Sequence, residues 1–116
     1  MDFDPELLAD EMKELFSKSK KLLIAIGDET RQGIITALMD LECDGKRVGE
    51  IKEKTHLSRP AVSHHLKILL DAEVVGLDRV GTKNYYYLKL GGEWQSLVKL
   101  INGIEELRAL GDCEEA

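Results

Sequence analysis

The chain has 116 residues and a formal net charge of −6, with 43% hydrophobic and 33% charged residues. This length predicts one domain that buries a core, and no stretch approaches the roughly 20 apolar residues of a membrane helix. Because the acidic N-terminus also lacks the apolar core of a secretory signal, we expect a cytoplasmic protein. Cys43 and Cys113 form no CxxC pair, which argues against a disulfide framework and a zinc ribbon.

The charge is unevenly distributed along the chain. Residues 46–90 hold nine Lys or Arg and five Asp or Glu, a local balance of +4, so the remainder carries −10. Such asymmetry can orient a domain on a polyanion, since phosphate attracts the basic part and repels the acidic part. It also predicts an affinity for nucleic acid that depends strongly on salt.

The first predicted element is a long helix over residues 4–26, either continuous or broken before Leu22. Asp4 can cap it, and Pro5 suits its first position. Apolar or small residues follow at steps of three and four: Leu8, Met12, Leu15, Ser19, Leu22, Leu23 and Ile26. So long a helix has more apolar face than a small domain covers, which indicates either a partner helix or a helix that wraps the domain.

A second helix is expected after Gly27, with Asp28 as its N-cap. Its inward residues are predicted to be Ile34, Ile35, Leu38 and Leu41. Arg31 falls in the first turn, where a cation opposes the helix dipole. We therefore expect a carboxylate or a phosphate beside Arg31.

Residues 49–73 have the pattern of a helix-turn-helix. A short helix should end near His56, a residue type that tolerates a left-handed conformation, and Ser58 can cap the next helix with Pro60 in its first turn. That second helix has an inward stripe of Val62, Leu66, Leu69 and Leu70. Its other face carries Arg59, Ser63, His64 and Lys67, which suits a recognition helix in a DNA major groove. A plain amphipathic helix with a solvated basic face fits this segment equally well.

Residues 74–90 read as a β-hairpin around Gly81, because two β-rich runs flank a short polar turn. Arg79 and Lys83 lie near its tip. A basic hairpin directly after a recognition helix is a wing, which can follow the DNA backbone or enter the minor groove.

The last predicted helix covers residues 93–110. Its apolar residues are Trp94, Leu97, Val98, Ile101, Ile104 and Leu107. Gly103 in mid-helix costs up to about 1 kcal/mol relative to Ala. Close approach of another helix, with the 4–26 helix as the expected companion, would explain this glycine. The tail from Gly111 onward is expected to fray.

The order of these elements resembles that of the ArsR-SmtB family of winged-helix repressors. Three segments carry the resemblance: residues 23–31 (LIAIGDETR), 61–67 (AVSHHLK) and 81–88 (GTKNYYYL). The match runs from Leu22 to Leu90. The resemblance implies a homodimer formed through the first and last helices, an operator with two-fold symmetry, and release by an effector. It also implies DNA contacts by the following residues: Arg59, Ser63, His64 and Lys67 on the recognition helix, and Arg79, Thr82 and Lys83 on the wing.

The chain departs from the family pattern at its metal sites. Arg47 and Gly49 occupy the two positions of the Cys-x-Cys ligands found in many relatives, and residues 94–110 lack the Asp and His pairs of another family site. All three histidines lie in the helix-turn-helix, so we expect neither a metal nor a cofactor. Glu73 stands where relatives usually have Gly, which leaves open how the turn into the wing is built.

We therefore expect a mainly α, winged helix-turn-helix domain over residues 1–116. Residues 4–26 and 93–110 are the expected dimerisation helices, and residues 49–73 and 74–90 the helix-turn-helix and the wing. The expected function is a homodimeric repressor of double-stranded operator DNA with a non-metal or unknown effector. Two alternatives remain, a redox or reactive-sulfur sensor using Cys43 and Cys113, and a protein-protein adaptor that does not bind DNA. No nucleophile-base pair, phosphate loop or metal triad indicates an enzyme.

Overall fold

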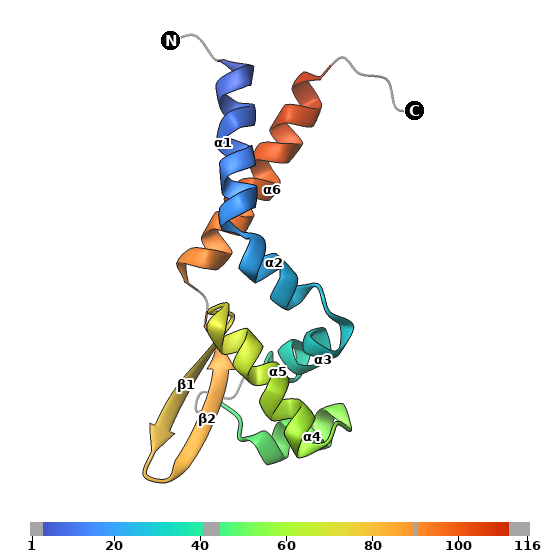
Figure 1. The fold of residues 1–116 in the computed structure, drawn as a ribbon, viewed down its shortest axis with the longest axis vertical. Helices are drawn as coiled ribbons and strands as arrows, with labels where there is room; N and C mark the ends of the chain where they lie inside the picture. The colour runs from blue at the N-terminus through green and yellow to red at the C-terminus, as the bar shows by residue number, and fades with distance from the viewer. Residues whose placement is uncertain (1–3, 41–44, 90, 112–116) are drawn as a thin grey trace. The chain divides into compact units, whose positions relative to one another are not determined.

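The computed structural model describes residues 4–40, 45–89 and 91–111. Within these ranges the chain forms six helices and one antiparallel hairpin (Figure 1). In chain order they are α1 (Pro5–Lys18), α2 (Lys20–Ile26), α3 (Glu29–Ala37), α4 (Val48–Thr55), α5 (Arg59–Asp71), β1 (Val75–Val80), β2 (Lys83–Leu88) and α6 (Gly92–Leu110). They divide into two compact units, one of α1 with α6 and the other spanning Lys21–Gly91. No helix of the described residues has the length and apolar character needed to cross a bilayer.

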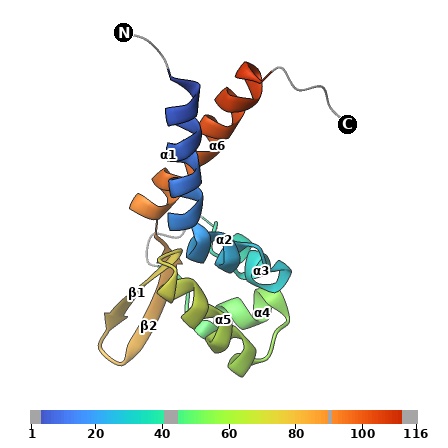
Figure 2. The same ribbon diagram turned by 45° about the horizontal axis from the view of Figure 1, so that its top comes forward.

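The helices α1 and α6 pack side by side, as both ribbon views show (Figures 1 and 2). Asp4 caps α1 by accepting hydrogen bonds from the N–H groups of Glu6 and Leu7. At Gly103 of α6, an added Cβ would lie 1.9 Å from Met12 Sδ on α1. The prediction that Gly103 permits close approach of the first helix is therefore confirmed.

The segment predicted as a helix over residues 4–26 forms two helices that meet at Ser19. The Ser19 N–H bonds to the carbonyl oxygens of both Leu15 and Ser17, where the regular ladder of α1 ends. Ser19 is buried. The alternative of a break before Leu22 is therefore the correct one. Apolar or small residues continue at helical steps through this point, which is why periodicity alone left a continuous helix open as well.

The helices α3, α4 and α5 pack against one another, and α5 and α4 contact the hairpin. Buried aliphatic side chains from all of them form the core of this unit: Ile34, Ile35, Leu38, Ile51, Val62, Leu66, Leu69, Val74 and Val75. The inward stripe predicted for α5 is thus confirmed at three positions, whereas Leu70 is half-buried. Leu41, Cys43, Leu90, Cys113 and the rest of the predicted frayed tail after Gly111 lie outside the described residues.

Two turns contain a non-glycine residue whose backbone has the left-handed conformation. His56 ends α4 with a φ of 58°, as predicted, and Glu73 lies between α5 and β1 with a φ of 59°. The turn into the wing therefore has the conformation that a glycine would favour, built with a glutamate whose carboxylate pairs with Lys89 at 3.2 Å.

The base of the hairpin is held by Lys46. Its backbone forms two hydrogen bonds with that of Tyr86, of 2.8 and 2.7 Å, and so adds an isolated bridge beside β2. The Lys46 side chain is 2% exposed, and its ammonium lies 3.5 Å from Asp40, which also pairs with Lys54. The Lys54 hydrogen bond and charge hold the pKa of Asp40 below its ordinary value.

Candidate nucleic-acid interface

The helix α5 presents its predicted DNA-reading residues on one exposed face. Ser58 caps the helix by accepting a 3.2 Å hydrogen bond from Ala61 N–H, and Pro60 lies in the first turn. Arg59, Ser63, His64 and Lys67 are all exposed, whereas Val62, Leu66 and Leu69 are buried. Residues four apart share one side of a helix, so the spacing that buries one face leaves these polar side chains available to a ligand.

The start of α5 lies beside the start of α4 and the wing. Together they line an open cleft of about 450 Å³ formed by Arg47, Val48, Gly49, Glu50, Glu53, Arg59, Thr82 and Asn84. The position that a Cβ on Gly49 would take is 3.5 Å from Nη2 of Arg59. The structure thus brings two predicted residues, Arg59 and Thr82, to one cleft.

Sequence reasoning did not single out Arg47 and Asn84 as neighbours of Arg59. The sequence could have indicated this only through their positions, since Arg47 lies at the start of a helix and Asn84 lies beside the hairpin turn. Arg47 is exposed, and its backbone N–H bonds to the Glu50 carboxylate at 3.1 Å. Arginine and asparagine side chains can both donate to phosphate oxygens, so the cleft adds donors to the predicted set.

The wing carries its basic residues at the hairpin tip. The closing pair of the ladder is Val80 with Lys83, and Gly81 between them has a φ of 64°. Nε of Arg79 donates a 3.3 Å hydrogen bond to the Gly81 carbonyl oxygen. Arg79, Thr82 and Lys83 are exposed, and both ribbon views show the hairpin projecting from the end of α5 (Figures 1 and 2).

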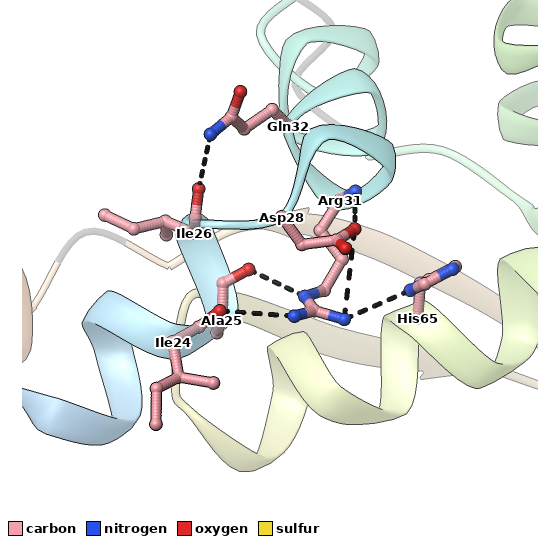
Figure 3. A network of polar contacts seen from close by, with 7 residues as sticks. All are labelled: Ile24, Ala25, Ile26, Asp28, Arg31, Gln32 and His65. Atoms are coloured by element: carbon pink, nitrogen blue, oxygen red, sulfur yellow. Dashed lines mark hydrogen bonds and ion pairs between the residues drawn. The ribbon is translucent and has the colours of Figure 1, made fainter.

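A polar network connects α2 and α3 to α5 (Figure 3). Asp28 caps α3 by accepting a 2.9 Å hydrogen bond from Arg31 N–H. That bond, together with the Arg31 guanidinium 4.0 Å away, holds the pKa of Asp28 below its ordinary value. The carboxylate partner expected for Arg31 is confirmed. His65 meets the same guanidinium and is half-buried, whereas its neighbour His64 is exposed.

The metal positions discussed for the family contain no ligand set in this chain. Arg47 and Gly49 line the cleft described above. Among the described residues, no three His, Cys, Asp or Glu side chains gather closely enough to hold an ion. Cys43 and Cys113, the candidates for redox sensing, lie outside those residues.

Comparison with known proteins identifies the family. Residues 28–76 match the model described as "Bacterial regulatory protein, arsR family". The chain is 32% identical to the uncharacterized HTH-type transcriptional regulator MJ1325 of Methanocaldococcus jannaschii over 91 residues, which cover 77% of this chain and 97% of the relative. It is 35% identical to the transcriptional repressor SdpR of Bacillus subtilis over 82 residues, 71% of this chain and 88% of that protein.

The solved structures agree with this result. An ArsR-like transcriptional regulator from Rhodococcus sp. RHA1 superposes with a TM-score of 0.68 at 26% identity, covering 82% of this chain and 85% of that one. The predicted winged-helix fold is confirmed, and the family consists of transcription regulators rather than enzymes. The chain therefore belongs to the ArsR family and is a DNA-binding transcriptional regulator.

Proposed function

We propose that this regulator is a homodimeric repressor that binds an operator with two-fold symmetry and releases it in response to an effector. The observation that carries the proposal is the open cleft in which Arg59 of α5 and Thr82 of the wing lie together. The similarity to a protein named as a transcriptional repressor supports repression over activation. Because its proposed target is operator DNA, we place its action in the cytoplasm.

The proposed contacts follow from side-chain chemistry. Arg59, Ser63 and His64 lie in the first two turns of α5, the part of a recognition helix that reaches base edges in the major groove. Lys67 lies one turn further along and suits a phosphate. On the wing, Arg79, Thr82 and Lys83 would follow the backbone, where hydroxyl and cationic groups bind phosphate oxygens without reading sequence.

The proposed dimer interface lies on α1 and α6. On α6 the stripe of Leu97, Leu100 and Gly103 is buried. A separate stripe on the same helix is exposed, with Val98 at 51% and Ile101 at 58%. Large apolar residues of α1 are exposed as well, namely Leu7 and Phe16. Uncovered apolar stripes on paired helices suit a second copy of the chain, since its association would remove them from water.

The dimer is tested by replacing one exposed residue of the stripe. We expect sedimentation to show two copies in the parent protein and one in Ile101→Glu. Gln95→Glu is the matched control, because it introduces the same charge at an exposed polar position of α6. A dimer that persists in Ile101→Glu would refute this interface.

The DNA contacts are tested by binding isotherms on the DNA upstream of the protein's own gene, over a salt titration. Arg59→Ala should cost about 1–3 kcal/mol and relax specificity at one base position. Lys83→Ala should weaken binding to all sequences and reduce the salt slope by about 1. Lys13→Ala, which removes one exposed charge from α1, is the control and should leave binding unchanged.

The same isotherms separate the alternatives. Family membership favours neither the adaptor nor the redox sensor. Absence of DNA binding at low salt would contradict the repressor and return the adaptor to consideration. Binding that changes with reductant would make Cys43 and Cys113 the effector site.

A further inference from the structure

Arg31 is the residue through which α2 and α3 are joined to α5. Its Nε donates a 2.7 Å hydrogen bond to the Ala25 carbonyl oxygen, and its Nη2 donates one of 3.2 Å to that of Ile24. Its Nη1 lies 3.3 Å from Nδ1 of His65 (Figure 3). The Arg31 side chain is only 12% exposed. The planar guanidinium of Arg31 therefore contacts both the carboxyl end of α2 and the middle of α5.

The direction of the contact with His65 follows from chemistry. A guanidinium has five N–H donors, no acceptor, and a charge that it keeps in proteins. A hydrogen bond between the two groups therefore uses the lone pair of His65 Nδ1 as its acceptor. His65 is held by this bond and faces Arg31, although it lies next to His64 on the recognition helix.

This contact adds a polar restraint on the rotation of α5 about its own axis, beside the packing of the buried Val62, Leu66 and Leu69. A rotation of about 10° moves a side-chain tip on a helix of this diameter by about 1 Å. Hydrogen bonds to base edges lose most of their strength over such a shift, whereas ionic attraction to phosphate changes little. Ser63, His64 and Lys67 move with His65, because they share its helix.

We infer that Arg31 is a positioning residue for base recognition, acting through the lone pair of His65. Arg31 itself touches no base. Its guanidinium is anchored on α2, and it fixes the angle at which α5 presents Ser63 and His64. This inference rests on the proposed function and deepens it, since it assigns the operator preference of α5 in part to a residue of α3.

The test compares two amide replacements of His65. In His65→Asn the side-chain amide occupies the place of Nδ1, so its oxygen can accept from Arg31. In His65→Gln the same amide sits one carbon further out, near the place of Nε2. The two variants are matched in polarity and charge, and both keep the Arg31 side chain that bonds to α2.

The readout is the ratio of affinities for operator and unrelated duplex DNA, measured with the salt slope and Tm. His65→Gln should lower the ratio about tenfold, which corresponds to about 1.4 kcal/mol. His65→Asn should stay within about twofold of the parent. The salt slope should be the same in all three, because no phosphate contact is lost.

Variants of α3 complete the experiment. Arg31→Lys keeps the charge but replaces the planar fork by one ammonium, so it should lower the ratio as His65→Gln does. The double variant Arg31→Lys/His65→Gln should be no worse than either single variant. Gln32→Ala is the control. Nε2 of Gln32 donates a 2.8 Å hydrogen bond to the Ile26 carbonyl oxygen at the same end of α2. Among the described residues, Gln32 has no hydrogen bond to His65.

Each outcome decides the inference. An unchanged ratio in His65→Gln, equal losses in the two His65 variants, or a loss in Gln32→Ala as large as in Arg31→Lys would overturn the positioning role while leaving the repressor intact. If the parent protein itself shows no operator preference, the proposed function fails and the inference fails with it.

Discussion

Gly103 offers a sharp test of the packing between α1 and α6, because its replacement by alanine has two opposed effects. Alanine removes a helix-propensity penalty of about 1 kcal/mol. It also places a Cβ 1.9 Å from Met12 Sδ and 2.9 Å from Met12 Cγ. Met12 is only 5% exposed, so its side chain has little free space into which it can move. Overpacking of this kind costs about 1–3 kcal/mol.

The second effect should prevail. We expect Gly103→Ala to lower the free energy of unfolding by about 1 kcal/mol, the difference between these two terms. For a domain of this size the Tm should fall by about 4 °C. Urea unfolding followed by circular dichroism measures the change. The protein concentration must be held constant, since a dimer's apparent stability depends on it.

The background variant Met12→Ala separates the two effects. By itself it should cost about 2–5 kcal/mol, because it opens a cavity. In that background Gly103→Ala meets no sulfur atom, so it should become stabilising by about 1 kcal/mol. The sign change is the diagnostic result. If Gly103→Ala stabilises the parent protein, the close approach of the two helices at this position is refuted.

Substitutions at three further positions test local features. At Glu73, with a φ of 59°, stability should rank Glu73→Gly above the parent and the parent above Glu73→Val. A left-handed non-glycine residue costs about 1–2 kcal/mol, which is more than the surface ion pair with Lys89 contributes to stability. Chemical denaturation measures the order of stability, and a Glu73→Val variant more stable than the parent would contradict this prediction. Ser58→Ala removes the cap of α5 and should cost about 1 kcal/mol, whereas Ser58→Asp should retain most of it in the same assay. Asp40 has a folded-state pKa below its ordinary 3.8, caused mainly by Lys54. Its contribution to stability is therefore full above that value and is lost as the pH falls through the lowered pKa. Asp40→Asn should make Tm less dependent on pH between about pH 5 and pH 2, and an unchanged pH profile would show that the pairs with Lys54 and Lys46 do not stabilise the fold.

Much of the local structure could be predicted because its signals are short in range. A capping side chain bonds to an N–H group within three residues, so Asp4, Asp28 and Ser58 were identifiable as N-caps. The left-handed end of α4 at His56 has a similarly local cause. Periodicity separated the buried and exposed faces of α5, and hence the candidate DNA-reading residues, whose contacts remain a prediction.

Packing decided what such signals do not contain. The apolar residues of α6 look alike in sequence, yet Leu97 is buried and Ile101 is exposed, because only one stripe faces α1. The apolar pattern continues through Ser19, so the sequence left open a continuous helix or a break before Leu22, and the structure places the break at Ser19.

The sequence by itself determined that this chain is a winged helix-turn-helix protein whose α5 has an exposed polar and basic face, because caps, periodicity and the hairpin pattern act between residues close in the chain. Only the tertiary structure decided that Arg31 links α2 to His65, and that Arg47 and Asn84 share a cleft with Arg59. Those residues lie on different elements, and the angles and distances between packed elements depend on the fit of many side chains at once. No local pattern records that fit.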